Sequence, residues 1–200
     1  MAHDTRGLTT EIKALAKRHD DAACTLIAVH SFASAAEAIC LAIESLAGYL
    51  AGSTARTPSK ASFLAFCRRY LPELGRTAPH AALAERPRQP IATCAEALYA
   101  AFRGGLLHDG ERAAGVRVVD DKGKWMLSFE PDGSARLNAI PFQAQFERGL
   151  DAYLRDLARD EALAAKAARR SAFLARRAFV HRGNEEYRPQ IPQIDTDKAR

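Results

Sequence analysis

An arginine and a histidine stand at a short, fixed spacing near the middle of the chain, in the segment Arg103-Gly104-Gly105-Leu106-Leu107-His108. Arginine stays positively charged at biological pH, and its planar guanidinium binds phosphate oxygens. Histidine has an unperturbed pKa of about 6.5 and can give or take a proton near neutrality. A cation that holds a phosphate and a base that moves a proton are two of the groups that phosphodiester cleavage requires.

The same segment also has a purely structural interpretation. An arginine near a helix C-terminus complements the helix dipole, and two glycines are a common helix stop. His108 is followed by Asp109-Gly110, which is typical of a turn. The R-x4-H spacing also arises often by chance. Spacing alone leaves both interpretations open, so the elements that position the two side chains matter.

Apolar residues recur at three- and four-residue steps over most of the chain, which predicts a mainly α fold. A short helix is expected over residues 9–19. A long one is expected over residues 26–50, with Asp20-Asp21 as its start signal and Gly52 as its stop. Thr57-Pro58 predicts the start of a third helix, with a proline at its first position.

The fourth predicted helix leads directly into the Arg103 segment. It starts at Pro90, passes through Leu98 and Phe102, and ends at Gly104-Gly105. Apolar and polar residues then alternate over residues 116–137 around Asp132-Gly133. This alternation predicts a small antiparallel β-hairpin.

The last predicted element is one long helix. Its apolar periodicity begins at Pro141 and continues toward Phe179. With 200 residues and 48% hydrophobic content, the chain suffices for one compact domain. We expect that domain over residues 1–182 and a disordered tail over residues 183–200, which lack apolar periodicity.

The run Leu98-Tyr99-x-x-Phe102-Arg103-x-Gly105-Leu106-x-His108 resembles the HEPN superfamily, in which an R-x(4 to 6)-H motif follows an apolar helix of an all-α bundle. The order of elements over residues 9–160 is also similar to that of a bacterial HEPN-like domain. The resemblance implies a mainly α, HEPN-like helical bundle with a small β-hairpin inserted before a long C-terminal helix.

In catalytic members of that superfamily, two protomers bring their motifs together into one metal-independent endoribonuclease site. The resemblance therefore implies a homodimer in which Arg103 and His108 of both chains cleave RNA without a metal or other cofactor, as a defence or toxin protein. Many members carry Asn, Asp or His where this chain has Gly104. Toxins that pair with a nucleotidyltransferase antitoxin often carry a tyrosine shortly after the histidine, whereas Asp109, Gly110 and Glu111 follow it here, which disfavours that pairing. The identity of any other antitoxin or partner protein stays open.

Two other functions fit the same sequence. In a catalytically inactive HEPN-like dimerisation or binding module, Arg103 would be neutralised by a carboxylate such as Glu37 or Glu44. These two residues and His30 follow one another at seven-residue steps and are expected on one helix face, which is either part of the cleft or a plain helix contact. The second alternative is a nucleic-acid-binding regulator that uses the final helix.

Basic residues accumulate in that final helix, where no acidic residue occurs between Ala162 and Asn184. Such a run binds nucleic acid by neutralising phosphates, and the net charge of +5 is compatible with an RNA-facing surface. A solvated helix end would have the same composition. The candidate RNA contacts are Arg169, Arg170, Arg176 and Arg177.

Other features exclude several classes of protein. Cys24, Cys40, Cys67 and Cys94 lie far apart without zinc-type spacing and are expected to be buried free thiols. The N-terminus lacks the apolar core of a signal peptide, and no stretch reaches the roughly 20 apolar residues that span a bilayer. These features predict a cytoplasmic protein without a membrane partner.

Overall fold

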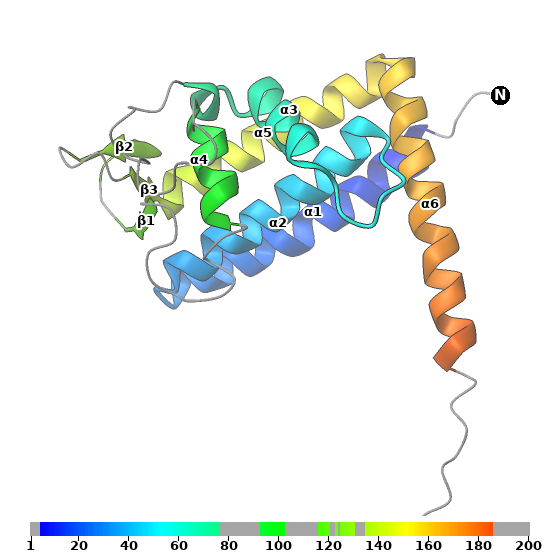
Figure 1. Cartoon of the computed structure of the whole chain (residues 1–200), viewed down its shortest axis with the longest axis horizontal. Coiled ribbons are helices and arrows are strands. Elements are labelled where there is room, and N and C mark those ends of the chain that lie inside the picture. The colour runs from blue at the N-terminus through cyan, green and yellow to red at the C-terminus, as the bar shows by residue number, and fades with distance from the viewer. Residues whose placement is uncertain are drawn as a thin grey trace, which may run out of the picture.

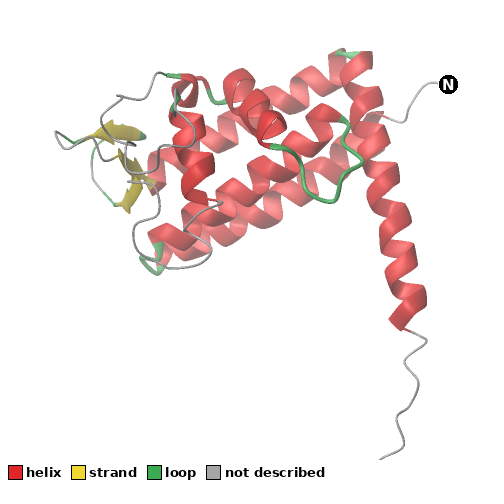
Figure 2. Cartoon of the chain, in the orientation of Figure 1, coloured by secondary structure: helices red, strands yellow, loops and turns green. Residues whose placement is uncertain are grey.

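A computed structural model describes residues 5–76, 93–102, 116–120, 123, 125–130 and 135–185, with side chains up to residue 178. These residues form α-helices, one short 3-10 helix and a three-stranded sheet (Figures 1 and 2), which confirms the prediction of a mainly α fold. In chain order the elements are α1 (Thr5–Ala28), α2 (Phe32–Ala51), α3 (Lys60–Tyr70), the 3-10 helix η1 (Pro72–Gly75), α4 (Cys94–Ala101), β1 (Val116–Val119), β2 (Leu127–Phe129), β3 (Ala135–Asn138), α5 (Ala139–Arg159) and α6 (Glu161–Glu185).

The first two helices correct the predicted boundaries. α1 runs without interruption past Asp20-Asp21, which therefore does not start a helix. The chain turns at residues 29–31, where His30 has a φ of 60° and the amide of Ser31 donates a 2.8 Å hydrogen bond to the carbonyl of Leu26. A residue in the left-handed conformation is a common helix terminator. The apolar pattern over residues 26–50 therefore spans parts of two helices.

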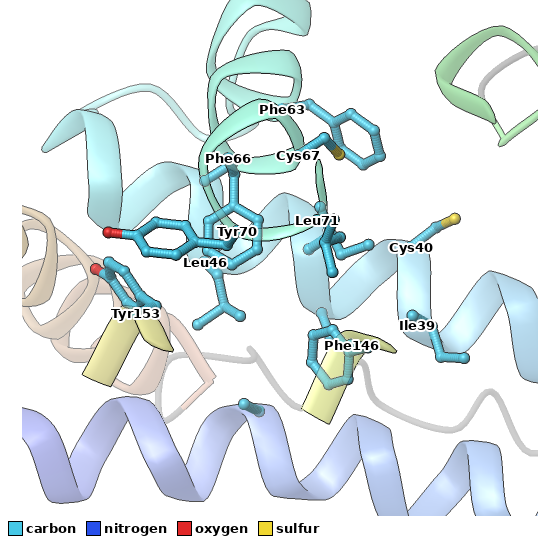
Figure 3. Packing of buried hydrophobic residues seen from close by; sticks show 14 of the residues in the cluster. Ile39, Cys40, Leu46, Phe63, Phe66, Cys67, Tyr70, Leu71, Phe146 and Tyr153 are labelled. Atoms are coloured by element: carbon cyan, nitrogen blue, oxygen red, sulfur yellow. The ribbon is translucent and has the colours of Figure 1, made fainter. Parts of the chain in front are cut away.

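α2 is the central helix of the bundle. It contacts α1, α3, α5, α6 and β1, and more than half of its 20 residues are buried. In Figure 3, Leu46 lies below the aromatic rings of Phe66 and Tyr70 from α3, with Tyr153 from α5 beside them. Small alanine side chains on α2, at positions such as 35, 36 and 42, allow the neighbouring helices to approach closely.

α2 is also the one helix, within the described part of the chain, that is long and apolar enough to cross a membrane. In this fold 61% of that stretch is buried against other elements. Such burial is typical of the core helix of a soluble protein. The predicted cytoplasmic location stays a prediction.

The small sheet contains the predicted hairpin and one further strand. β2 and β3 pair antiparallel, with Leu127 opposite Leu137, as the hairpin prediction requires. β1 adds to the other edge of β3 in parallel orientation, with Val116 opposite Ala135, so the strand order is β1-β3-β2. The sheet lies at one end of the bundle (Figure 1), where it contacts α2, α4 and α5.

The predicted single C-terminal helix is in fact two helices. The carboxylate of Asp160 accepts a 2.9 Å hydrogen bond from the amide of Leu163 and so caps the start of α6. The apolar periodicity continues across this break because Leu157 and Leu163 are both buried. The first half of α6 lies against the bundle and the second half extends beyond it (Figure 1). α6 is described to Glu185, and the rest of the predicted tail lies outside the described residues.

Candidate functional site

The Arg103 segment directly follows α4, whose start is fixed by a reciprocal cap. The hydroxyl of Thr93 accepts a hydrogen bond from the amide of Glu96 (3.3 Å), and the carboxylate of Glu96 accepts one from the amide of Thr93 (3.1 Å). This capping box satisfies two amides that a helix start leaves without partners. α4 therefore begins at Cys94 and not at Pro90.

The other end of α4 is held by packing. Leu98 and Phe102 are buried, and the ring of Tyr99 lies 5.2 Å from that of Phe63 on α3. α4 also contacts η1 and β1. Phe102, the residue directly before the motif, is thus anchored in the core of the bundle. Residues 103–115, and with them Arg103 and His108, fall outside the described residues, so their geometry stays a prediction.

The predicted row of His30, Glu37 and Glu44 is not one helix face. Glu37 and Glu44 lie on α2 and are both half-buried. His30 belongs instead to the turn between α1 and α2, where its ring packs edge-on against Phe32 at 5.7 Å. The row is therefore reduced to the two carboxylates.

The candidate RNA contacts on α6 fall into two groups. Arg169 and Arg176 are exposed, and so is the neighbouring Lys166. Arg177 is half-exposed, and its guanidinium lies 5.9 Å from the centre of the Phe173 ring. None of these four cations forms an ion pair with a described residue. They are therefore available to an anion such as a phosphate.

Arg170 differs, and the expectation that it contacts RNA is revised. Only 4% of this residue is exposed. Its guanidinium donates hydrogen bonds to the carbonyls of Ser53 (3.0 Å), Ala55 and Arg56 (3.4 Å) in the loop between α2 and α3. Burial also lowers the pKa of Arg170 from its ordinary value, because the charged form loses its hydration. Arg170 binds the loop and is not at the surface.

The cysteines do not form a reactive or metal-binding site in the described part of the chain. Cys40, Cys67 and Cys94 are buried free thiols, as predicted, whereas Cys24 is exposed, which corrects the prediction for that residue. Burial raises the pKa of Cys40 and of Cys67 and keeps both in the less reactive thiol form. Among the described residues, no three His, Cys, Asp or Glu side chains are placed to hold a metal ion.

Comparisons with known protein families, with curated proteins and with solved structures found no match to this chain. A functional proposal therefore depends on the residues of the chain itself and on the motif resemblance described above.

Proposed function

We propose that the chain is a HEPN-like, metal-independent endoribonuclease of the defence or toxin type, in which Arg103 and His108 of two protomers form one site at a homodimer interface. The observation that supports it best is that the motif follows the end of α4 directly in the sequence. This helix is capped at Thr93 and buried at Phe102, so the residue before Arg103 has a fixed position. Catalytic side chains need such support to hold their geometry.

The chemistry assigns one task to each side chain. The 2′-oxygen of a ribose attacks the adjacent phosphorus, and the bond from phosphorus to the 5′-oxygen of the next nucleotide breaks. His108 moves the proton at the 2′-oxygen or at the leaving 5′-oxygen, and Arg103 stabilises the added negative charge on the phosphorane-like transition state. The products are a 2′,3′-cyclic phosphate and a free 5′-hydroxyl.

The experiment is a cleavage assay of the purified full chain on end-labelled single-stranded RNA in the presence of EDTA. We expect His108→Ala and Arg103→Ala to reduce the rate by about 100-fold or more, because a positioned acid or base contributes roughly 10² to 10⁴ in rate. The matched control is His30→Ala, since His30 lies in an exposed turn outside the motif. Equal cleavage by wild type and His108→Ala would overturn the proposal.

A second candidate is a nucleic-acid-binding regulator that does not cleave. Lys166, Arg169 and Arg176 favour it, because they are exposed and form no ion pair with any residue that the structure describes. It predicts RNA binding that weakens steeply with salt and is unaffected by His108→Ala. If wild type binds RNA without cutting it, the regulator replaces the nuclease. If it neither binds nor cuts but forms a dimer in sedimentation analysis, the inactive dimerisation module is the remaining function.

A further inference from the structure

The exposed cations of α6 have a basic neighbour, Arg56, in the loop between α2 and α3, residues 52–59. The stretch 52–60 contains Arg56 and Lys60 and no acidic residue. Arg56 is exposed and Lys60 is half-exposed. In Figure 1 this loop, drawn in cyan, runs beside the orange α6, and the hydrogen bonds from Arg170 confirm the contact. Positive side chains from two distant parts of the sequence are thus brought together.

Gly52 permits this close contact. It has a φ of +61°, and a Cβ atom placed on it would lie 2.9 Å from the carbonyl oxygen of Lys166 and 2.8 Å from a guanidinium nitrogen of Arg169. Only a residue without a side chain fits so near the α6 backbone. Arg170 then holds the next part of the loop through three carbonyls, which places Arg56 at the edge of α6.

No carboxylate of the described residues forms an ion pair with the cations at this contact, which are Arg56, Lys60, Lys166 and Arg169. Arg170 is a buried cation whose hydrogen-bond partners are neutral carbonyls. The carboxylate of Glu11 is bonded to the hydroxyls of Tyr49 and Ser171. Gathering like charges without counterions is unfavourable, and a bound polyanion would reverse that cost.

We propose that Arg56, Lys166 and Arg169 form one surface that binds the phosphodiester backbone of RNA, with Arg170 as the positioning residue that fixes the loop. Lys166 and Arg169 are three residues apart on α6 and so lie on adjacent turns of one face. The surface contacts phosphates and not bases, so binding is independent of sequence and sensitive to salt. The ligand class rests on the proposed ribonuclease function.

The test measures binding of a labelled single-stranded RNA by anisotropy at several salt concentrations, with all chains carrying His108→Ala so that the RNA stays intact. Log affinity falls as log salt concentration rises. We expect the triple variant Arg56→Gln, Lys166→Gln, Arg169→Gln to make this slope less steep by about 2, because each phosphate contact to a single strand contributes about 0.7. The matched control is the triple variant Arg68→Gln, Arg148→Gln, Arg155→Gln. It removes three exposed cations elsewhere and so has the same net charge as the first triple variant. The proposed surface would be refuted if the triple variant had the same slope as the parent, or if the control variant lost as much of the slope as the triple variant.

Two further variants test the loop and the positioning role. Arg56→Gln alone alters an exposed side chain and is expected to lower the slope by about 0.7. Arg170→Lys keeps the charge but loses the planar fork that spans three carbonyls. We expect it to weaken binding in the parent and to have no further effect once Arg56 is glutamine, because Arg170 acts through the loop. Additive losses would contradict this role.

These outcomes are separate from those of the cleavage assay. Binding that depends on the three cations in a wild type that never cuts RNA supports the surface and removes the nuclease. If the wild type cuts RNA and its RNA binding does not depend on these cations, the nuclease is supported and the surface is refuted.

Discussion

The hydroxyl of Tyr49 donates a 2.8 Å hydrogen bond to Oε1 of Glu11, and Oε2 of the same carboxylate accepts a 2.6 Å hydrogen bond from Ser171. α1, α2 and α6 meet at this carboxylate. Burial, and then the bond to Glu11, raise the pKa of Tyr49, so its hydroxyl remains a proton donor at physiological pH. Glu11 therefore ties α6 to the bundle beside the loop that Arg170 holds.

We expect Tyr49→Phe to lower the free energy of unfolding by about 1–3 kcal/mol, because a partly buried hydrogen bond to a charged group is lost. Urea unfolding followed by circular dichroism measures the change. Tyr153→Phe is the matched control: its hydroxyl is buried and has no hydrogen-bond partner among the described residues. Its removal should be neutral or stabilising. Equal destabilisation by the two variants would show that the Glu11 contact is not what Tyr49 contributes.

Gly52→Ala should destabilise the fold by roughly 1–2 kcal/mol from its left-handed backbone alone. The added Cβ would also press on the carbonyl of Lys166 at 2.9 Å. Gly75→Ala is the control, because a Cβ there meets no atom within 4 Å. Thermal unfolding of the two variants and of wild type gives the comparison. A Gly52→Ala variant as stable as Gly75→Ala would mean that the loop can leave α6 without cost.

Asp156 should make a small contribution to stability that depends on pH. The hydrogen bond from Arg69, followed by that from Tyr70, lowers the pKa of Asp156 below its ordinary value of 3.8. A lowered folded-state pKa means that the contribution is present above pH 3.8 and is lost as the pH falls through the folded value. The pair is half-exposed, so screening by solvent keeps the effect small.

The measurement for Asp156 is the difference in Tm between wild type and Asp156→Asn across pH. The difference should be largest near neutrality and should shrink below about pH 4. The control is the same substitution in a chain that carries Arg69→Gln, where the hydrogen bond from Arg69 to Asp156 is absent and the trend should be weaker. A difference for Asp156→Asn that grows in acid has the wrong sign and would refute the assignment.

The helices that bury one clear face could be predicted from the sequence. Phe63, Phe66 and Tyr70 of α3 recur at three- and four-residue steps and are all buried, and Leu98 and Phe102 of the α4 segment are buried as well. Periodicity identifies such faces because it reports which side chains leave water. The start of α4 was predicted wrongly at Pro90, although Thr93 and Glu96 have the spacing of a capping box.

The breaks between helices were harder to predict. At His30 the chain adopts a left-handed turn without a glycine or proline to mark it, and the apolar pattern continues into α2. At Asp160 the backbone is extended, and the apolar pattern again continues into the next helix, although an aspartate three residues before Leu163 is a recognisable cap. Apolar periodicity shows which residues are buried but not whether the helix is continuous. The prediction therefore merged helices that are separate in the structure.

Contacts between distant segments could not be read from the sequence at all. Arg169 and Arg170 are adjacent and chemically identical, yet one is exposed and the other binds a loop more than 100 residues away in sequence. The parallel pairing of β1 with β3 also joins strands that do not follow one another in the chain. The Arg103 and His108 pair lies beyond the described ranges and remains a prediction.

The central position of α2 has a consequence for how the protein unfolds. Four helices and a strand pack against α2, so deleting any of them would expose part of its apolar surface to water. Most of the bundle should therefore melt in one cooperative step, and truncated fragments that retain α2 without its neighbours should aggregate.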